Sequence, residues 1–117
     1  MTLPMLPIVL SCNVAADEAV YRLAVPEDLP AFQGHFPGRP ILPGVVQIDW
    51  VAQLAAKSWG LPSVARVFQV KFRNIISPGN ALTLTLRFDR ARGRVHFEYT
   101  SDESIMSAGR IALEPLA

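Results

Sequence analysis

One apolar segment, residues 45–59, constrains the fold more than any other part of the chain. It holds neither proline nor glycine over about 15 residues, it follows Pro43 and Gly44, and Gly60 and Pro62 come soon after it. Proline and glycine in these places are the start and stop signals of a helix, which would be roughly 22 Å long. Apolar residues cover most of its circumference, so the rest of the fold has to surround it.

β-prone runs on both sides of this segment provide the surrounding layer. Two of them precede it, at residues 6–13 and 19–25, and the others follow it, at residues 63–73, 81–88, 94–100 and 104–113. Serial strands joined by short turns suggest an antiparallel meander. We therefore predict an α+β fold in one domain, residues 1–117, in which a curved antiparallel sheet wraps around one long central helix. A second copy of the chain would cover what remains of the helix.

The composition excludes several classes of protein. Half of the residues are apolar and 18% are charged, which describes a folded globular chain and not a disordered one. The formal net charge of +1 argues against nucleic acid as the main ligand, because phosphate binding needs a concentrated basic surface. No apolar run reaches the roughly 20 residues that a helix needs to cross a bilayer. We expect a cytoplasmic protein without a membrane span.

The single cysteine, Cys12, cannot form a disulfide within the chain. Free cysteines are usually buried as small hydrophobic residues, and we expect this for Cys12. The alternative is a lipoprotein signal, because residues 9–12 read VLSC. No Lys or Arg precedes that stretch, and Pro4 and Pro7 interrupt an apolar run that is already too short for an export helix.

The polar residues of the predicted helix leave two interpretations open. Asp49, Gln53 and Lys57 are four residues apart and share one face. Such a face usually meets water. The alternative is that Asp49 is a working acid at the edge of an apolar cavity, and the spacing alone does not separate the two.

The segment before the helix favours the second interpretation. Three prolines at residues 37, 40 and 43 fix the backbone there, while glycines at residues 38 and 44 permit turns or the close approach of another group. His35 opens this stiff segment, so its imidazole would have little freedom. A lone histidine is more often structural, but the rigid segment on one side and the isolated acid on the other favour a functional role.

The block FQGHFPGRPILPGVVQIDWVAQL, residues 32–54, resembles the β-hydroxyacyl-[acyl-carrier-protein] dehydratases of fatty-acid synthesis and their relatives in polyketide-like and aryl-polyene pathways. It has the family's histidine at His35, a Pro-Gly pair before the helix, an acid fourteen residues after the histidine at Asp49, and a glutamine four residues later at Gln53. A weaker match follows at residues 70–86. A match of this length and order is more specific than a short motif.

This resemblance implies a hot-dog fold, in which the curved sheet wraps the central helix, and a dimer whose two sheets join edge to edge. It places the active site at the dimer interface, with His35 from one chain and Asp49 from the other. His35, neutral, would take the proton next to the thioester carbonyl, and Asp49, protonated, would give a proton to the departing β-hydroxyl. The N–H of Gly44 at the helix start would stabilise charge on the carbonyl oxygen, and an apolar tunnel would keep Asp49 protonated.

The expected substrate is therefore a β-hydroxyacyl thioester on the phosphopantetheine of an acyl carrier protein, and this chemistry needs no cofactor and no metal. Gln53 would fix Asp49 or a neighbouring backbone group, or would simply be exposed. Trp50 stands where the family usually has a small residue, so it either reshapes the acyl tunnel or fills core volume. The residues expected to contact the substrate or its carrier are Phe36, Arg39, Val45, Trp50 and Gln53.

Several alternatives stay open on the sequence. The related dehydratase-isomerases have Asp at the acid position, as here, but they have Cys at the position of Val45, so isomerase activity is undecided. A thioesterase on the same fold would use an acid or a water in place of the His35 and Asp49 pair. The chain could also be a non-catalytic partner subunit or an acyl-binding module, in a homodimer or a hetero-oligomer. Residues 89–94 read as a solvated hairpin tip or as a contact for an acidic carrier protein, and His96 reads as a surface residue.

Overall fold

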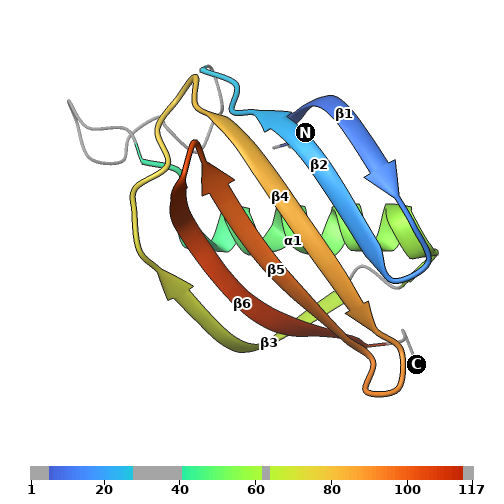
Figure 1. The fold of residues 1–117 in the computed structure, drawn as a ribbon. Helices are drawn as coiled ribbons and strands as arrows, with labels where there is room; N and C mark the ends of the chain where they lie inside the picture. Colours follow the sequence, from blue (N-terminus) through green and yellow to red (C-terminus); the bar gives the residue numbers. More distant parts are fainter. Residues whose placement is uncertain (1–5, 28–40, 62–63, 115–117) are drawn as a thin grey trace, which may run out of the picture.

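The computed structural model describes residues 6–27, 41–61 and 64–114 (Figure 1). These residues form one six-stranded antiparallel sheet, with the helix α1 crossing one of its faces. The elements in chain order are β1 (Ile8–Val14), β2 (Glu18–Ala24), α1 (Gly44–Trp59), β3 (Val64–Phe72), β4 (Ala81–Asp89), β5 (Arg94–Ser101) and β6 (Ser104–Glu114). The predicted α+β architecture is thus confirmed. None of the helices in this part of the chain is long and apolar enough to cross a membrane.

The helix has the limits that the proline and glycine signals predict, with one residue more at its start. Pro43 is the N-cap, in an extended conformation with φ −62° and ψ 147°. Proline suits the start of a helix, because the helix leaves the N–H groups there without a partner and proline has no N–H. Gly60 ends the helix in the left-handed region at φ 66°, and its N–H donates to the carbonyl of Ala56. The position of Gly44 in the first turn is therefore fixed by local sequence.

The strand order is β1-β2-β4-β5-β6-β3. The meander prediction is confirmed for β4, β5 and β6, which pair in sequence through short turns. It is wrong for β3, which pairs with β6 and not with β4. The position of α1 explains this pairing. β3 follows α1 directly and forms the edge of the sheet opposite β1. The chain must therefore return across the sheet to reach β4. β1 and β3 are consequently the two edges.

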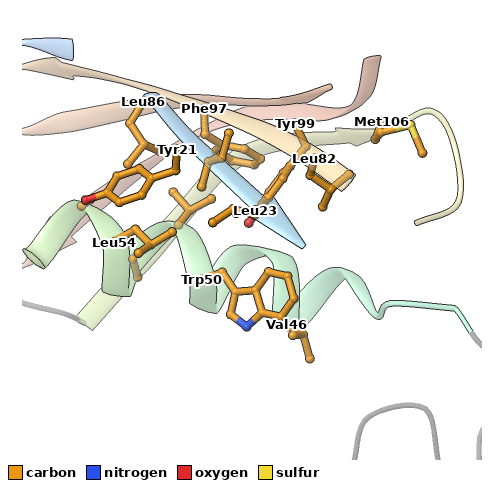
Figure 2. Packing of buried hydrophobic residues seen from close by; sticks show 14 of the residues in the cluster. Tyr21, Leu23, Val46, Trp50, Leu54, Leu82, Leu86, Phe97, Tyr99 and Met106 are labelled. Atoms are coloured by element: carbon orange, nitrogen blue, oxygen red, sulfur yellow. The ribbon is translucent and has the colours of Figure 1, made fainter. Parts of the chain in front are cut away.

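The core lies between the sheet and α1 (Figure 2). Alternate residues of β2, β4 and β5 are buried, as the period of two in a half-buried strand predicts. Their large members include Tyr21, Leu23, Leu84, Leu86, Phe97 and Tyr99, and the helix adds Val46, Trp50, Val51 and Leu54. One stripe of the helix carries residues that the described part of the chain leaves exposed or half-buried. We call the exposed or half-buried residues Val45, Asp49, Gln53 and Lys57 the open face of α1.

Cys12 lies in β1, and the prediction that it is buried is wrong, because its side chain is exposed. All seven residues of β1 are exposed. The reason is position: β1 is an edge strand that pairs with β2 alone among the strands described. An apolar sequence leads to burial only where a second layer covers the strand.

Gly109 of β6 allows the edge strand β3 to pack closely against β6. A Cβ added at Gly109 of β6 would lie 2.2 Å from the carbonyl oxygen of Gln69 and 3.1 Å from a ring carbon of Phe97. The register between β3 and β6 shifts at this place, between Val67 and Gln69. Only a residue without a side chain permits the two strands to approach so closely.

Candidate active site

The start of α1 has no capping side chain among the residues described. Its N-cap, Pro43, makes no side-chain hydrogen bond, and no acid lies in the first turn. The N–H groups of Val46 and Gln47 donate to the carbonyl of Pro43, at 3.1 and 3.2 Å, while the N–H of Gly44 donates to none of the residues described. The helix dipole and this N–H both favour negative charge at the helix start.

Gly44 is also a point of close approach. A Cβ there would lie 2.5 Å from Cζ of Phe72, at the end of β3. The ring thus lies directly on the backbone of the first turn. A hollow of about 280 Å³ opens beside it, lined by residues 41–44, Gln47 and residues 72–76. Large apolar side chains near this helix start are exposed: Val45 by 74%, and Phe72 and Ile75 by 53% each.

The carboxylate of Asp49 lies on the open face of α1, five residues after Gly44. Its Oδ2 accepts a hydrogen bond of 2.5 Å from Nε2 of Gln53. The sequence left open whether Gln53 fixes Asp49 or is only exposed, and this bond agrees with the first interpretation. The Asp49 side chain itself is exposed in the single chain, so the residues described do not form the apolar surroundings expected for it.

A second hollow, of about 310 Å³, begins beside the Asp49 and Gln53 pair. It is lined by Gln53, Leu54 and Lys57 of the helix and by Leu6, Pro7 and Val9 at the start of β1. The N-terminal strand thus contributes to the surroundings of the open face. Sequence reasoning did not predict this contribution.

A buried polar network behind the helix start was also missed by sequence reasoning. Gln47 is 4% exposed; its Nε2 donates to the carbonyl of Leu42 at 3.2 Å, and its Oε1 accepts from Oγ of Ser107 at 2.7 Å. The hydroxyl of Tyr99 donates to the backbone carbonyl of Gln47 at 2.7 Å. The helical period indicates that Gln47 is buried, because Gln47 lies three and four residues before the buried Trp50 and Val51.

The environment of Tyr99 keeps its hydroxyl protonated. Burial, and to a smaller extent the charge of Asp49, raise the pKa of Tyr99 well above its usual range. The hydroxyl therefore remains a donor to the helix at any ordinary pH.

The structure describes some of the predicted site residues and not others. His35, Phe36 and Arg39 lie outside the described residues. Trp50 is 0% exposed and belongs to the buried cluster (Figure 2), which agrees with the core-filling alternative. Val45, by contrast, is 74% exposed and lies on the open face.

Two surface positions agree with the sequence. His96 is exposed. Residues 90–93 form the hairpin tip, where Nε of Arg90 lies 3.1 Å from Oδ1 of Asp17 with side-chain exposures of 58% and 69%. Arg90 also lies 4.8 Å above the ring of Phe88, so this arginine already has partners within the chain.

Comparison with known proteins agrees with this geometry. Residues 11–110 match the family model described as ApeI-like, ApeI dehydratase. The chain belongs to the ApeI-like dehydratase family. It is 38% identical over 103 residues to the 3-hydroxyacyl-[acyl-carrier-protein] dehydratase FabZ of Novosphingobium aromaticivorans, covering 79% of this chain and 65% of that protein. The FabZ of Rickettsia massiliae is 37% identical over 94 residues, covering 73% of this chain and 63% of that one. The chain thus spans just under two thirds of the length of these curated relatives.

Solved structures give the same fold. The dehydratase heterocomplex ApeI:P from Xenorhabdus doucetiae superposes with a TM-score of 0.85 and 36% identity, covering 93% of this chain and 98% of that one. The dehydratase domain of the polyketide PpsC from Mycobacterium tuberculosis has a TM-score of 0.71 at 18% identity, over 99% of this chain and 46% of that one. The ApeI-like chain therefore has the predicted hot-dog fold, with its helix and sheet arranged as in these dehydratases.

Proposed function

We propose that this chain dehydrates a β-hydroxyacyl thioester, held on the phosphopantetheine of an acyl carrier protein, to the trans-enoyl thioester and water. Membership of the ApeI-like family and the similarity to FabZ proteins support this reaction. The observation that carries the proposal is the placement of two groups on one helix: Gly44 at its uncapped start, and Asp49 bonded to Gln53 on its open face. Elimination of water needs a donor at the carbonyl oxygen and an acid at the leaving hydroxyl.

The proposed reaction proceeds through an enolate. The neutral imidazole of His35 removes a proton from the carbon next to the thioester carbonyl, and the electrons of that C–H bond move toward the carbonyl oxygen. The N–H of Gly44 stabilises the charge on this oxygen. Asp49 then gives its proton to the β-hydroxyl as the C–O bond breaks, the carbon–carbon double bond forms, and water leaves. His35 ends protonated and Asp49 ionised, and exchange with solvent restores both.

In this proposal two subunits share each site. Asp49 is exposed in the single chain, and the apolar side chains of Val45 and Phe72 are exposed by 74% and 53% near the same helix. A second hot-dog subunit seated there would bury this surface and exclude water from Asp49, which favours the protonated carboxyl. His35 of one subunit would act with Asp49 of the other. The second subunit is a copy of this chain or a related one, and the similarity to the ApeI:P heterocomplex supports a related chain.

The acyl chain is proposed to be of the specialised, aryl-polyene type, with saturated fatty-acyl chains as the alternative. The match to the ApeI-like model favours the first, and the FabZ relatives favour the second. A panel of β-hydroxyacyl carrier thioesters, aliphatic and aryl, distinguishes them through kcat/KM. Following the position of the double bond in the same products tests for isomerase activity.

The experiment for the reaction is subunit mixing. His35→Ala and Asp49→Asn are prepared separately, and enoyl-thioester formation is followed before and after subunit exchange. Each variant alone should be inactive, and the mixture should regain activity because each hybrid dimer holds one site without a lesion. Lys57→Gln, on the same open face two turns further along, is the matched control and should stay active alone.

The outcomes separate the candidate functions. Inactive hybrids, with exchange verified by mass, would contradict the shared site. Release of free thiol without enoyl product from the unmodified protein would favour the thioesterase. Absence of both products, with activity appearing only when a related hot-dog chain is added, would favour a partner subunit.

A further inference from the structure

Two buried tyrosines connect the sheet to α1, one at each end of the helix. Tyr99 of β5 donates to the carbonyl of Gln47 at 2.7 Å, and the hydroxyl of Tyr21 in β2 lies 2.6 Å from Oγ of Ser58. Both tyrosines are buried, with exposures of 0% and 2%. Figure 2 shows both side chains extending from the sheet toward the helix.

The two ends of the helix differ in their other hydrogen bonds. At the C-terminal end, Ser58 donates to the carbonyl of Leu54 within the helix itself, and Nε1 of Trp59 donates to the carbonyl of Ala15 at 2.9 Å. At the N-terminal end, the side chain of Gln47 joins the helix to Ser107 of β6 and to the carbonyl of Leu42. The N–H of Leu42 in turn donates to the carbonyl of Ile76 at 2.8 Å. The N-terminal end is thus tied to the sheet and to the segment that precedes the helix.

Gly44 lies in the middle of these contacts. Leu42, two residues before it, is held through both its N–H and its carbonyl, and Gln47, three residues after it, is held through its side chain and its carbonyl. The Phe72 ring lies against Gly44 itself. The backbone around the N–H of Gly44 therefore has little freedom to turn.

A buried glutamine is a costly way to pack a helix, because an apolar side chain of similar size needs no hydrogen-bond partners. Hydrogen bonds, however, fix direction as well as distance. A fully paired polar network of this kind holds one arrangement of the chain and not several. An oxyanion donor needs such fixed direction, because it must already point to where the charge develops.

We propose that Gln47, held by Tyr99 and Ser107, is a positioning residue that aims the N–H of Gly44 at the thioester oxygen. The inference rests on the proposed dehydration, since it assigns Gly44 the task of binding that oxygen. Gln47 touches no reacting atom; it acts through the backbone of residues 42–44.

The test compares the two ends of the helix. Tyr99→Phe removes the hydroxyl contact near Gly44, and Tyr21→Phe removes the equivalent contact at the far end, so Tyr21→Phe is the matched control. Both should lower the melting temperature by similar amounts. Tyr99→Phe should lower kcat about tenfold with KM nearly unchanged, and Gln47→Leu about 100-fold, since small misplacements at a reacting group have effects of this size. Tyr21→Phe should leave kcat within about twofold.

Ser107 gives a second pair of variants. Ser107→Thr keeps the hydroxyl that donates to Oε1 of Gln47, and Ser107→Ala removes it. We expect kcat to fall in the alanine variant and to be retained in the threonine variant. Equal kcat in both would overturn the inference, as would equal losses of kcat in the Tyr99→Phe and Tyr21→Phe variants.

Amide hydrogen exchange tests the positioning without any substrate. Exchange at residues 46 and 47, whose N–H groups donate to the carbonyl of Pro43, should become faster in Gln47→Leu and Tyr99→Phe and stay unchanged in Tyr21→Phe. Unchanged exchange there in Gln47→Leu would overturn the inference even if the protein is an active dehydratase. If the unmodified protein forms no enoyl product, the proposed function fails, whereas faster exchange in these two variants would still support the restraint on the helix start.

Discussion

Replacing Gly44 by alanine tests whether contact with Phe72 sets the shape of the site. The new Cβ would lie 2.5 Å from Cζ of Phe72 and 3.0 and 3.1 Å from two more ring carbons. Carbon atoms in favourable contact are about 3.5–4.0 Å apart, so the ring and the first turn of α1 must separate by about 1 Å. The ring lines the hollow beside Gly44, so its displacement changes the shape of the site, and a change of this size next to the reacting groups can lower the rate by about 100-fold.

The loss should appear in activity and not in stability. Alanine is preferred over glycine within a helix by about 1 kcal/mol, and Phe72 is 53% exposed, so its ring can turn toward solvent. We expect the free energy of unfolding of Gly44→Ala, measured in urea, to stay within about 1 kcal/mol of the unmodified protein. The kcat/KM for enoyl-thioester formation should fall about 100-fold.

A double-mutant cycle identifies the cause. In a Phe72→Ala background the new Cβ meets no ring, so the same Gly44→Ala substitution should lower kcat/KM by no more than about tenfold. The difference corresponds to a coupling of about 1.4 kcal/mol between the two residues. An equal loss in both backgrounds would refute the reasoning, because the ring contact would then not be responsible.

Three further predictions concern burial and charge. Trp50→Ala should lower the free energy of unfolding by about 3–5 kcal/mol, because Trp50 is 0% exposed; a loss near zero would contradict its burial. Cys12, exposed on β1, should react with a thiol reagent in the folded protein, and protection until urea unfolds the chain would contradict the edge position. Burial raises the pKa of Tyr99, so its contribution to stability is complete below the unfolded value of about 10 and is lost as pH rises through the folded value. Unfolding midpoints between pH 9 and 11.5 should therefore fall more steeply in the unmodified protein than in Tyr99→Phe, and parallel slopes would contradict this.

Features set by local conformation could be predicted from the sequence. Pro43 and Gly60 mark the limits of α1 because proline fixes φ and glycine permits the left-handed region. The alternation of residues 81–88 gave β4 and its buried face correctly, since the period of two depends on the strand alone. The common face of Asp49 and Gln53 follows in the same way from the helical period.

Features set by distant contacts could not be predicted. Gln47 binds Ser107, 60 residues away, and Tyr99, 52 residues away, and the helical pattern indicates only that Gln47 is buried. The burial of Cys12 was predicted wrongly because strand composition does not tell whether a second layer lies over the strand. The pairing of β3 with β6 depends on where the chain emerges from α1.

The close approach at Gly109 links the far edge of the sheet to the site. A methyl group at that position would press on the carbonyl of Gln69 and drive β3 away from β6. The same strand ends in Phe72, whose ring rests on Gly44. A random-mutagenesis screen for lost activity should therefore recover substitutions at residue 109, although this residue has no side chain and lies outside the helix that bears Gly44 and Asp49. Such variants would be mistaken for changes of catalytic residues unless the pairing of β3 with β6 were measured as well.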